Sequence, residues 1–242
     1  MIEVQDLAKR YGDVRAVDGA TFTARDGAIT TLLGANGSGK TTTLNMLMGL
    51  LKPDRGVARI DGIAAEANAQ EARRLTGWFP DSVGLYPRLT SREHMRYFGE
   101  LHGMKGKALE EAISSTVAAL RMEDIADRRT EGFSTGQRMK VALARALVHA
   151  PRNIILDEPT RGLDVISVRL LRETLRKLRG EGRCILMSSH VMAEVQELSD
   201  HIVCIAGGRV VAEGSPQALM AQADAPNLEE AFIRLAVEAL RC

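Results

Sequence analysis

Short apolar runs alternate with longer segments of helical periodicity, and this alternation predicts an α/β protein with a largely parallel sheet. Four compact apolar runs have the composition of strands that are buried on both faces. We predict these central strands at Ala28–Leu33, Asn153–Asp157, Cys184–Ser188 and Ile202–Ala206. Three other runs alternate apolar with polar positions and predict an antiparallel, half-exposed flank: Ile2–Gln5, Ala20–Ala24 and Val57–Asp61.

Helical patterns dominate from about residue 82 to 150, and we interpret this stretch as a helical subdomain inserted in the α/β core. Thr90 and Glu93 have the spacing of a capping box at the start of one of its helices. The residues from about 227 to 241 predict an amphipathic C-terminal helix that is capped by Asn227.

Composition limits the class of protein. The length of 242 residues suggests one large or two small domains, and the sequence has neither an internal repeat nor a low-complexity segment. The net charge of +1 argues against a dedicated nucleic-acid-binding protein, which usually carries a basic excess. Three cysteines are too few for a disulfide scaffold and favour a reducing, cytosolic setting; Cys242 has no assigned role. The charged N-terminus does not resemble a signal peptide, and no uncharged apolar run approaches the roughly 18–20 residues of a membrane helix.

A phosphate-binding loop follows the first central strand. Gly34–Thr41, the phosphate loop, has the form GxxxxGKT and leads into a helical pattern. Glycines let backbone N–H groups turn inward around a phosphate, and the dipole of the helix that starts there favours the anion. Lys40 brings a positive charge to the β- and γ-phosphates, and the hydroxyl of Thr41 can bind Mg²⁺. A glycine turn that binds nothing would not explain the strand before the loop and the helix after it.

An apolar strand ends in two carboxylates, Asp157 and Glu158, and they indicate which reaction the phosphate loop serves. Asp157 is placed to hold Mg²⁺ through water, and Glu158 can polarise the water that attacks a γ-phosphate. Strand ends also carry structural carboxylates, so the pair alone leaves both interpretations open. Together with the phosphate loop, it predicts hydrolysis of a nucleoside triphosphate.

Three further motifs carry a family resemblance: the signature segment Phe133–Arg138 (FSTGQR), Gly162–Asp164 (GLD) and Ser189-His190. With these motifs in this order around the phosphate loop and LDEPT, the chain resembles the ATP-binding subunit of an ABC transporter over essentially its whole length. The resemblance implies that residues 1–242 form a single ABC-type ATPase domain. Its fold would be a phosphate-loop NTPase core with a mixed, mostly parallel sheet, an antiparallel β flank and the inserted helical subdomain. The resemblance also implies that the chain binds ATP and Mg²⁺ and hydrolyses ATP.

The resemblance implies a role for each matching residue. Tyr11 stacks on adenine. The catalytic residues are Glu158 as the base, His190 as the switch that hydrogen-bonds to the γ-phosphate, and Lys40. The nucleotide-binding residues are Gly34, Asn36, Gly37, Ser38, Gly39, Lys40, Thr41 and Thr42, with Ser134, Gly136 and Gln137 as a second anion site. The ligands of Mg²⁺ are Thr41, Asp81 and Asp157. The remaining histidines match no motif and are assigned no functional role: His94, His102, His149 and His201.

The resemblance also implies partners. The signature segment of one copy faces the γ-phosphate that a second copy holds, so ATP is clamped between the two chains of a homodimer, with Asp164 across the interface. ATP closes the pair, and hydrolysis opens it. A separate integral membrane permease is the expected transport partner, which makes the chain a peripheral subunit at the cytoplasmic face of the cell membrane.

Three positions depart from the family pattern. Asp81 stands where glutamine is usual; a carboxylate still binds Mg²⁺, but with a shorter reach and an added charge. In the signature segment, Phe133 replaces the usual leucine and Thr135 the usual first glycine, which a negative φ at Thr135 would tolerate. Neither Lys40 nor Glu158 is affected, so we expect an active ATPase.

Two segments, Asp81–Ser91 and Asn227–Leu235, resemble the ATPase subunits of two-component exporters of the sodium-extruding NatA type and the antibiotic-exporting DrrA type, and lean toward NatA. We expect short helices of the permease to dock near Val83–Arg92. Three apolar side chains there form a docking patch: Leu85, Tyr86 and Leu89.

Alternative functions stay open at this point, namely export of a drug or lipid-like substrate and a soluble mechanical ABC ATPase. Mechanical ATPases usually carry two ATPase domains or a long coiled-coil insertion, and neither is found in this sequence. A phosphate-loop kinase would need an acceptor pocket and lid arginines, and it leaves the signature segment unexplained. We interpret a row of arginines at helical spacing as a solvated helix face rather than a nucleic-acid contact: Arg169, Arg172, Arg176 and Arg179.

Overall fold

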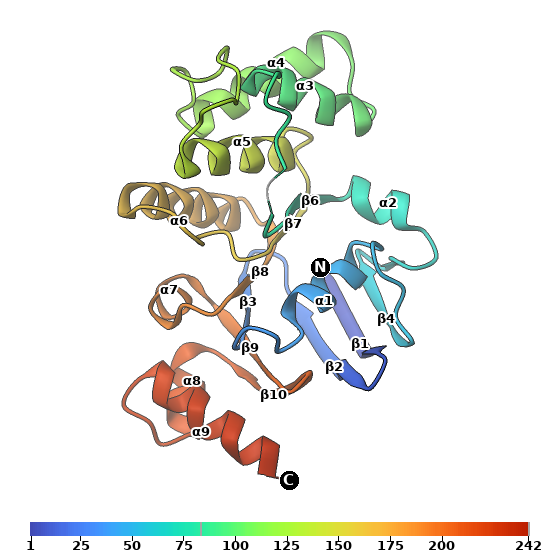
Figure 1. Ribbon diagram of the computed structural model, residues 1–242, viewed down its shortest axis with the longest axis vertical. Coiled ribbons are helices and arrows are strands. Elements are labelled where there is room, and N and C mark those ends of the chain that lie inside the picture. The colour runs from blue at the N-terminus through green and yellow to red at the C-terminus, as the bar shows by residue number, and fades with distance from the viewer. Residues whose placement is uncertain (83, 242) are drawn as a thin grey trace.

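The computed structural model describes residues 1–82 and 84–241, so Val83 of the expected docking segment and Cys242 lie outside the described residues. Figure 1 shows two sheets in the middle of the molecule, with a group of helices at one end. Helices α8 (Pro216–Gln222) and α9 (Leu228–Arg241) lie at the opposite end, and the chain ends there.

The larger sheet has the strand order β10-β9-β3-β8-β7-β6. All its pairs are parallel except the one between β9 and β10 at one edge. The strands are β3 (Ile29–Leu33), β6 (Thr76–Phe79), β7 (Asn153–Leu156), β8 (Cys184–Ser189), β9 (His201–Ala206) and β10 (Arg209–Gly214). The four predicted central strands are confirmed within one or two residues at each end, and β3, β7 and β8 are buried along their whole length. The edge strands β6 and β10 are not predicted by the sequence pattern.

The smaller sheet is antiparallel and has the order β2-β1-β4-β5. Its strands are β1 (Ile2–Tyr11), β2 (Val14–Ala24), β4 (Arg55–Ile60) and β5 (Ile63–Ala64). The predicted flank is confirmed, but β1 and β2 are each longer than expected. The pairing of β1 with β2 is irregular around Asp6, whose φ is 48°. This irregularity interrupts the alternation of apolar and polar residues, so the sequence pattern does not predict the second half of β1.

Three helices occupy the chain between β6 and β7: α3 (Ser91–Leu101), α4 (Gly106–Ala119) and α5 (Thr135–Leu147). The predicted capping box at α3 is confirmed, since Thr90 accepts from the N–H of Glu93 and the Glu93 carboxylate accepts from the N–H of Thr90. Asn227 likewise caps α9 by accepting from the N–H of Glu230. The remaining helices are α1 (Lys40–Leu47), α2 (Ala69–Arg74), α6 (Val165–Gly180) and α7 (Met192–Leu198).

The register of the parallel strands explains why residues far apart in sequence meet. Leu33 at the end of β3 pairs with Ser189 at the end of β8, and Phe79 at the end of β6 pairs with Leu156 at the end of β7. The segments that follow these strands therefore emerge at one edge of the sheet. Ligand sites of open α/β sheets form at such carboxyl-terminal edges.

The arginine row on α6 is not a free basic surface. Arg169 pairs with Glu173 on the same helix, and the other three arginines pair with acidic residues at or after the end of α7. These pairs are Arg172–Glu197, Arg176–Glu197 and Arg179–Asp200. The row is thus a solvated helix face, as predicted, and its charge is compensated within the chain.

Two cysteines pack in the core, as predicted. Cys184 and Cys204 are buried in β8 and β9, and burial raises the pKa of each thiol to about 12. Among the described residues, there is no helix whose length and apolar character would let it cross a membrane.

Candidate functional site

The phosphate loop connects β3 to α1 at the carboxyl edge of the larger sheet. Gly39 has a φ of 107°, and a Cβ atom there would lie 2.3 Å from the backbone oxygen of Ala16, so the position requires glycine. Helix α1 begins at Lys40 without a side-chain cap, which leaves its first backbone N–H groups available to an anion.

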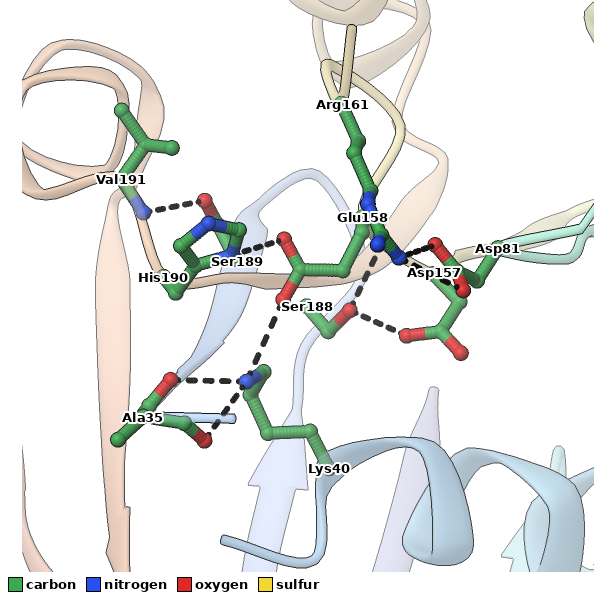
Figure 2. Close-up of polar contacts among 11 residues, drawn as sticks. Ala35, Lys40, Asp81, Asp157, Glu158, Arg161, Ser188, Ser189, His190 and Val191 are labelled. Atoms are coloured by element: carbon green, nitrogen blue, oxygen red, sulfur yellow. Dashed lines mark hydrogen bonds and ion pairs between the residues drawn. The ribbon is translucent and has the colours of Figure 1, made fainter. Parts of the chain in front are cut away.

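Lys40 is buried and bends back over the loop (Figure 2). Its Nζ atom donates to the carbonyl oxygen of Gly34 at 2.8 Å and to that of Ala35 at 3.2 Å. The same atom lies 3.3 Å from Oε1 of Glu158, with the two side chains 5% and 9% exposed. The lysine of the phosphate loop and the carboxylate after β7 are therefore brought into direct contact.

Asp157 and Glu158 are held in place by Ser188 near the end of β8. The Ser188 hydroxyl accepts from the N–H of Glu158 at 2.9 Å and donates to Oδ1 of Asp157 at 2.5 Å. Glu158 has a φ of 48°, a conformation that L-residues adopt only where the surroundings enforce it and that is common at functional sites. Ser188 lies outside the motifs of the sequence, although it shares with Asp157 the signal of a polar residue at the end of an apolar strand.

His190 completes the group. Its Nδ1 atom lies 2.8 Å from Oε2 of Glu158, and the neighbouring Ser189 hydroxyl accepts from the N–H of Val191 (Figure 2). One carboxylate, that of Glu158, thus contacts a lysine on one oxygen and a histidine on the other. Such an arrangement fixes the direction of the carboxylate, which a general base needs.

The electrostatics of this edge favour a cation. Burial raises the pKa of Asp157 above its ordinary value, hydrogen bonds from Ser188 and Thr41 lower it in part, and the charges of Asp81 and Glu158 raise it further. Two carboxylates buried side by side repel each other, and a metal ion would relieve that repulsion.

Two buried oxygen atoms of this edge, Ser38 Oγ and Asp157 Oδ2, have no hydrogen-bond or ion-pair partner among the described residues, and Glu158 Oε1 has only its ion-pair contact with Lys40. Buried polar atoms are rarely left unpaired unless a ligand or water satisfies them. Mg²⁺ prefers oxygen ligands, and the Thr41 hydroxyl is near enough to Asp157 to lower the pKa of its carboxyl. The residues present therefore fit a Mg²⁺-triphosphate.

Asp81, the other residue for which the sequence predicts a metal role, has a different partner. Both of its carboxylate oxygens are bound by one nitrogen of Arg161, at 2.9 and 3.1 Å (Figure 2). Arg161 lies in the turn after Glu158 and was not among the residues that the sequence analysis selected.

The residues of the predicted second anion site lie at the N-terminus of α5. Ser134 caps the helix in a capping box with Gln137, and Ser134 is exposed. A Cβ atom on Gly136 would lie 2.3 Å from the Ser167 hydroxyl, so α5 and α6 meet at this glycine. Asp164 caps α6 by accepting from the N–H and the hydroxyl of Ser167. These residues form one surface around the start of α6.

Two predictions concern single positions. Thr135 is the first residue of α5 and has helical backbone, so the side chain that replaces glycine there causes no strain at φ. Tyr11 is 51% exposed at the end of β1, with the Lys9 ammonium 5.9 Å from its ring centre. Its exposed ring is free to stack on a planar ligand.

Comparison with known proteins gives a consistent result. Residues 17–161 match the family described as ABC transporter. The chain is 38% identical over 238 residues to the ABC transporter ATP-binding protein NatA of Bacillus subtilis (strain 168), covering 96% of this chain and 97% of that protein. It is 39% identical over 219 residues to the Nod factor export ATP-binding protein I of Burkholderia lata, covering 90% and 72%. The dimeric structure of MJ0796, a bacterial ABC transporter cassette, superimposes with a TM-score of 0.80 at 27% identity over 89% of this chain and 98% of that chain.

Proposed function

The chain belongs to the ABC transporter family as an ATP-binding, ATP-hydrolysing subunit, and from this premise we propose that it works as a homodimer that drives export through a separate membrane permease. The observation that carries the proposal is the contact of Glu158 with Lys40 and His190 at one sheet edge, 3.3 and 2.8 Å away.

In the proposed mechanism, Lys40 exchanges its contact with Glu158 for one with the phosphate oxygens of ATP. This exchange frees Oε1 of Glu158 to accept a proton from the attacking water, while His190 holds Oε2. Thr41 and Asp157 would hold Mg²⁺, which neutralises charge on the phosphate oxygens. Tyr11 would stack on the adenine ring.

The homodimer is supported by the surface around the start of α6. Ser134 is exposed there, and Val165 and Ile166 are 86% and 82% exposed. Exposed apolar side chains beside a solvent-exposed helix N-terminus suit an interface that closes over an anion. The MJ0796 cassette, which has the same fold, forms a dimer. We propose that Ser134, Gly136 and Gln137 of one protomer complete the ATP site of the other.

The permease is proposed to dock on the helical side of the site. Tyr86 of the docking patch is 52% exposed and contacts the rings of His94 and Tyr97, beside a hollow of about 630 Å³. A second hollow, of about 370 Å³, lies among α2, α3, α5 and β6, with Trp78 and Leu101 in its lining. Apolar hollows of this kind accept short amphipathic helices. Such docking would place the chain at the cytoplasmic face of the cell membrane.

Reconstitution tests this proposal. The chain is purified alone and together with a six-helix permease encoded next to it, and ATP hydrolysis and flux are measured in liposomes. We expect Mg²⁺-dependent hydrolysis by the chain alone and ATP-dependent export by the pair, with Na⁺ flux as the first assay. If the chain hydrolyses ATP but binds no membrane partner, the result would instead favour a soluble mechanical ATPase. Flux of a drug or lipid without flux of Na⁺ would support the exporter function and show that its substrate is not Na⁺.

A further inference from the structure

An ion pair joins two loops at the reactive edge of the larger sheet. Asp81 follows β6, and Arg161 follows β7. The two strands pair in parallel, and the N–H of Asp157 donates to the carbonyl oxygen of Phe79 at 2.8 Å. Beyond this last backbone bond, the side chains of Asp81 and Arg161 continue the connection between the loops (Figure 2).

Arg161 lies at the end of a tight turn that begins at Glu158. The N–H of Arg161 donates to the carbonyl oxygen of Glu158 at 3.1 Å, which closes the turn Glu158–Arg161. The turn is thus fixed at its start by the sheet and at its end by the bond from Arg161 to Asp81. Because Glu158 has a left-handed backbone conformation, it depends on such external restraints to stay in place.

The contribution of this ion pair to folding stability is small. Asp81 and Arg161 are 37% and 64% exposed, and surface ion pairs of this kind contribute on the order of 1 kcal/mol or less. Both residues also line a cleft of about 520 Å³ that Glu158 and Thr135 share. The ion pair between Asp81 and Arg161 is therefore placed to influence the position of the Glu158 carboxylate, and it contributes little to the stability of the core.

We propose that Arg161 is a positioning residue for ATP hydrolysis, which acts through Asp81 to hold the turn Glu158–Arg161 and so keeps the Glu158 carboxylate directed at the site. The inference rests on the proposed function, in which Glu158 is the base. It gives Asp81 a role as the anchor of Arg161 in place of the metal-ligand role that the sequence predicts.

A double-mutant cycle tests the proposal. The proteins are the wild type, Asp81→Asn, Arg161→Met and the double variant, and kcat and KM for ATP are measured for each. We expect each single substitution to lower kcat about tenfold, because small displacements of a reactive group cost this much or more. KM should change less than twofold, since the phosphate loop is untouched. The double variant should be no slower than the slower single variant.

Matched variants separate positioning from a general loss of charge. Arg161→Lys should recover most of kcat, because one nitrogen of Arg161 makes both contacts with Asp81 and an ammonium can replace it. Arg169→Met removes a surface arginine that is ion-paired with Glu173 on α6, and kcat should stay at the wild-type value. Thermal unfolding of every variant reports on folding.

A readout independent of turnover addresses the metal. Binding of a fluorescent ATP analogue is titrated with Mg²⁺, and we expect the same Mg²⁺ midpoint for Asp81→Asn, Arg161→Met and the wild type. A higher Mg²⁺ midpoint in Asp81→Asn together with a lower midpoint in Arg161→Met would show that Asp81 is a metal ligand. This result would overturn the proposal. A wild-type kcat in both single variants would also overturn the proposal. So would a kcat of the double variant that is lowered by the product of the two single-variant factors. Hydrolysis by the wild type is unaffected by these outcomes, so the proposed function is judged separately.

Discussion

The ammonium of Lys40 lies 3.3 Å from Oε1 of Glu158, and both side chains are almost completely buried. A buried charge depends on its partner, because removal of either member leaves the other uncompensated. The proposed phosphate-binding cation and the proposed base therefore neutralise each other, and a triphosphate that binds Lys40 would release Glu158 for catalysis.

Replacement of Lys40 by alanine should weaken nucleotide binding about a hundredfold, because charge-assisted hydrogen bonds contribute about 1.5–3 kcal/mol each. Binding of a fluorescent ATP analogue measures the effect. Lys52→Ala, which removes an exposed lysine paired with Glu66, is the control and should bind as the wild type does. Full affinity in Lys40→Ala would remove Lys40 from the phosphate site.

Glu158→Gln should keep ATP bound and lower kcat at least about a hundredfold, because the amide cannot accept the proton of the attacking water. The ATP that is not hydrolysed should hold two chains together, so gel filtration with MgATP should show a dimer. Glu229→Gln, in the first turn of α9, is the matched control. Normal turnover by Glu158→Gln would exclude Glu158 as the base.

Ser134→Arg should stop hydrolysis and leave ATP binding by single chains intact, because the bulky cation obstructs the exposed N-terminus of α5 that we propose faces the partner. A mixture with Lys40→Ala provides the decisive test. Half of the dimers would contain one intact site, made of the phosphate loop of one variant and the signature segment of the other. Activity should return to roughly a quarter of the wild type in an equal mixture. A mixture as inactive as its components would contradict the shared site.

Ser188→Ala should lower kcat and destabilise the fold, because it leaves the N–H of Glu158 and Oδ1 of Asp157 without their common partner. Each unpaired buried group costs about 1–3 kcal/mol. Ser188→Thr keeps the hydroxyl and should retain more activity and a higher melting temperature than alanine. Steady-state kinetics and thermal unfolding provide both measurements, and equal behaviour of the two variants would mean that the hydroxyl is unimportant.

The folding stability should fall with pH between about 6.5 and 4 because of His149. Burial and the positive charges of His102 and Arg183 lower the pKa of His149 from 6.5 to about 4, against a hydrogen bond with the Thr76 carbonyl that raises it, so the fold favours the neutral ring. The stabilisation is complete above pH 6.5 and is lost as the pH falls toward 4. Between pH 6.5 and 4, the free energy of unfolding measured with urea should fall less for His149→Gln than for the wild type. An unchanged pH slope in His149→Gln would contradict the prediction.

The central strands could be predicted because strands buried on both faces are continuous apolar runs, and β3, β7 and β8 are such runs. The strand β6 could not, because its four residues Thr76–Phe79 include a glycine and are too few to establish a period. β10 begins with arginine and ends with glutamate and glycine, and its place at the sheet edge comes from pairing with β9.

The sequence by itself determined which residues are the candidates for the chemistry, since Lys40, Glu158 and His190 each follow a recognisable strand and lie in motifs whose residue types suit phosphate. Only the tertiary structure decided their partners: Lys40 with Glu158, Ser188 with both Asp157 and Glu158, and Asp81 with Arg161. The reason is physical. Strand and helix signals depend on neighbours along the chain, whereas these contacts depend on strand order and register, which the packing of the whole sheet sets.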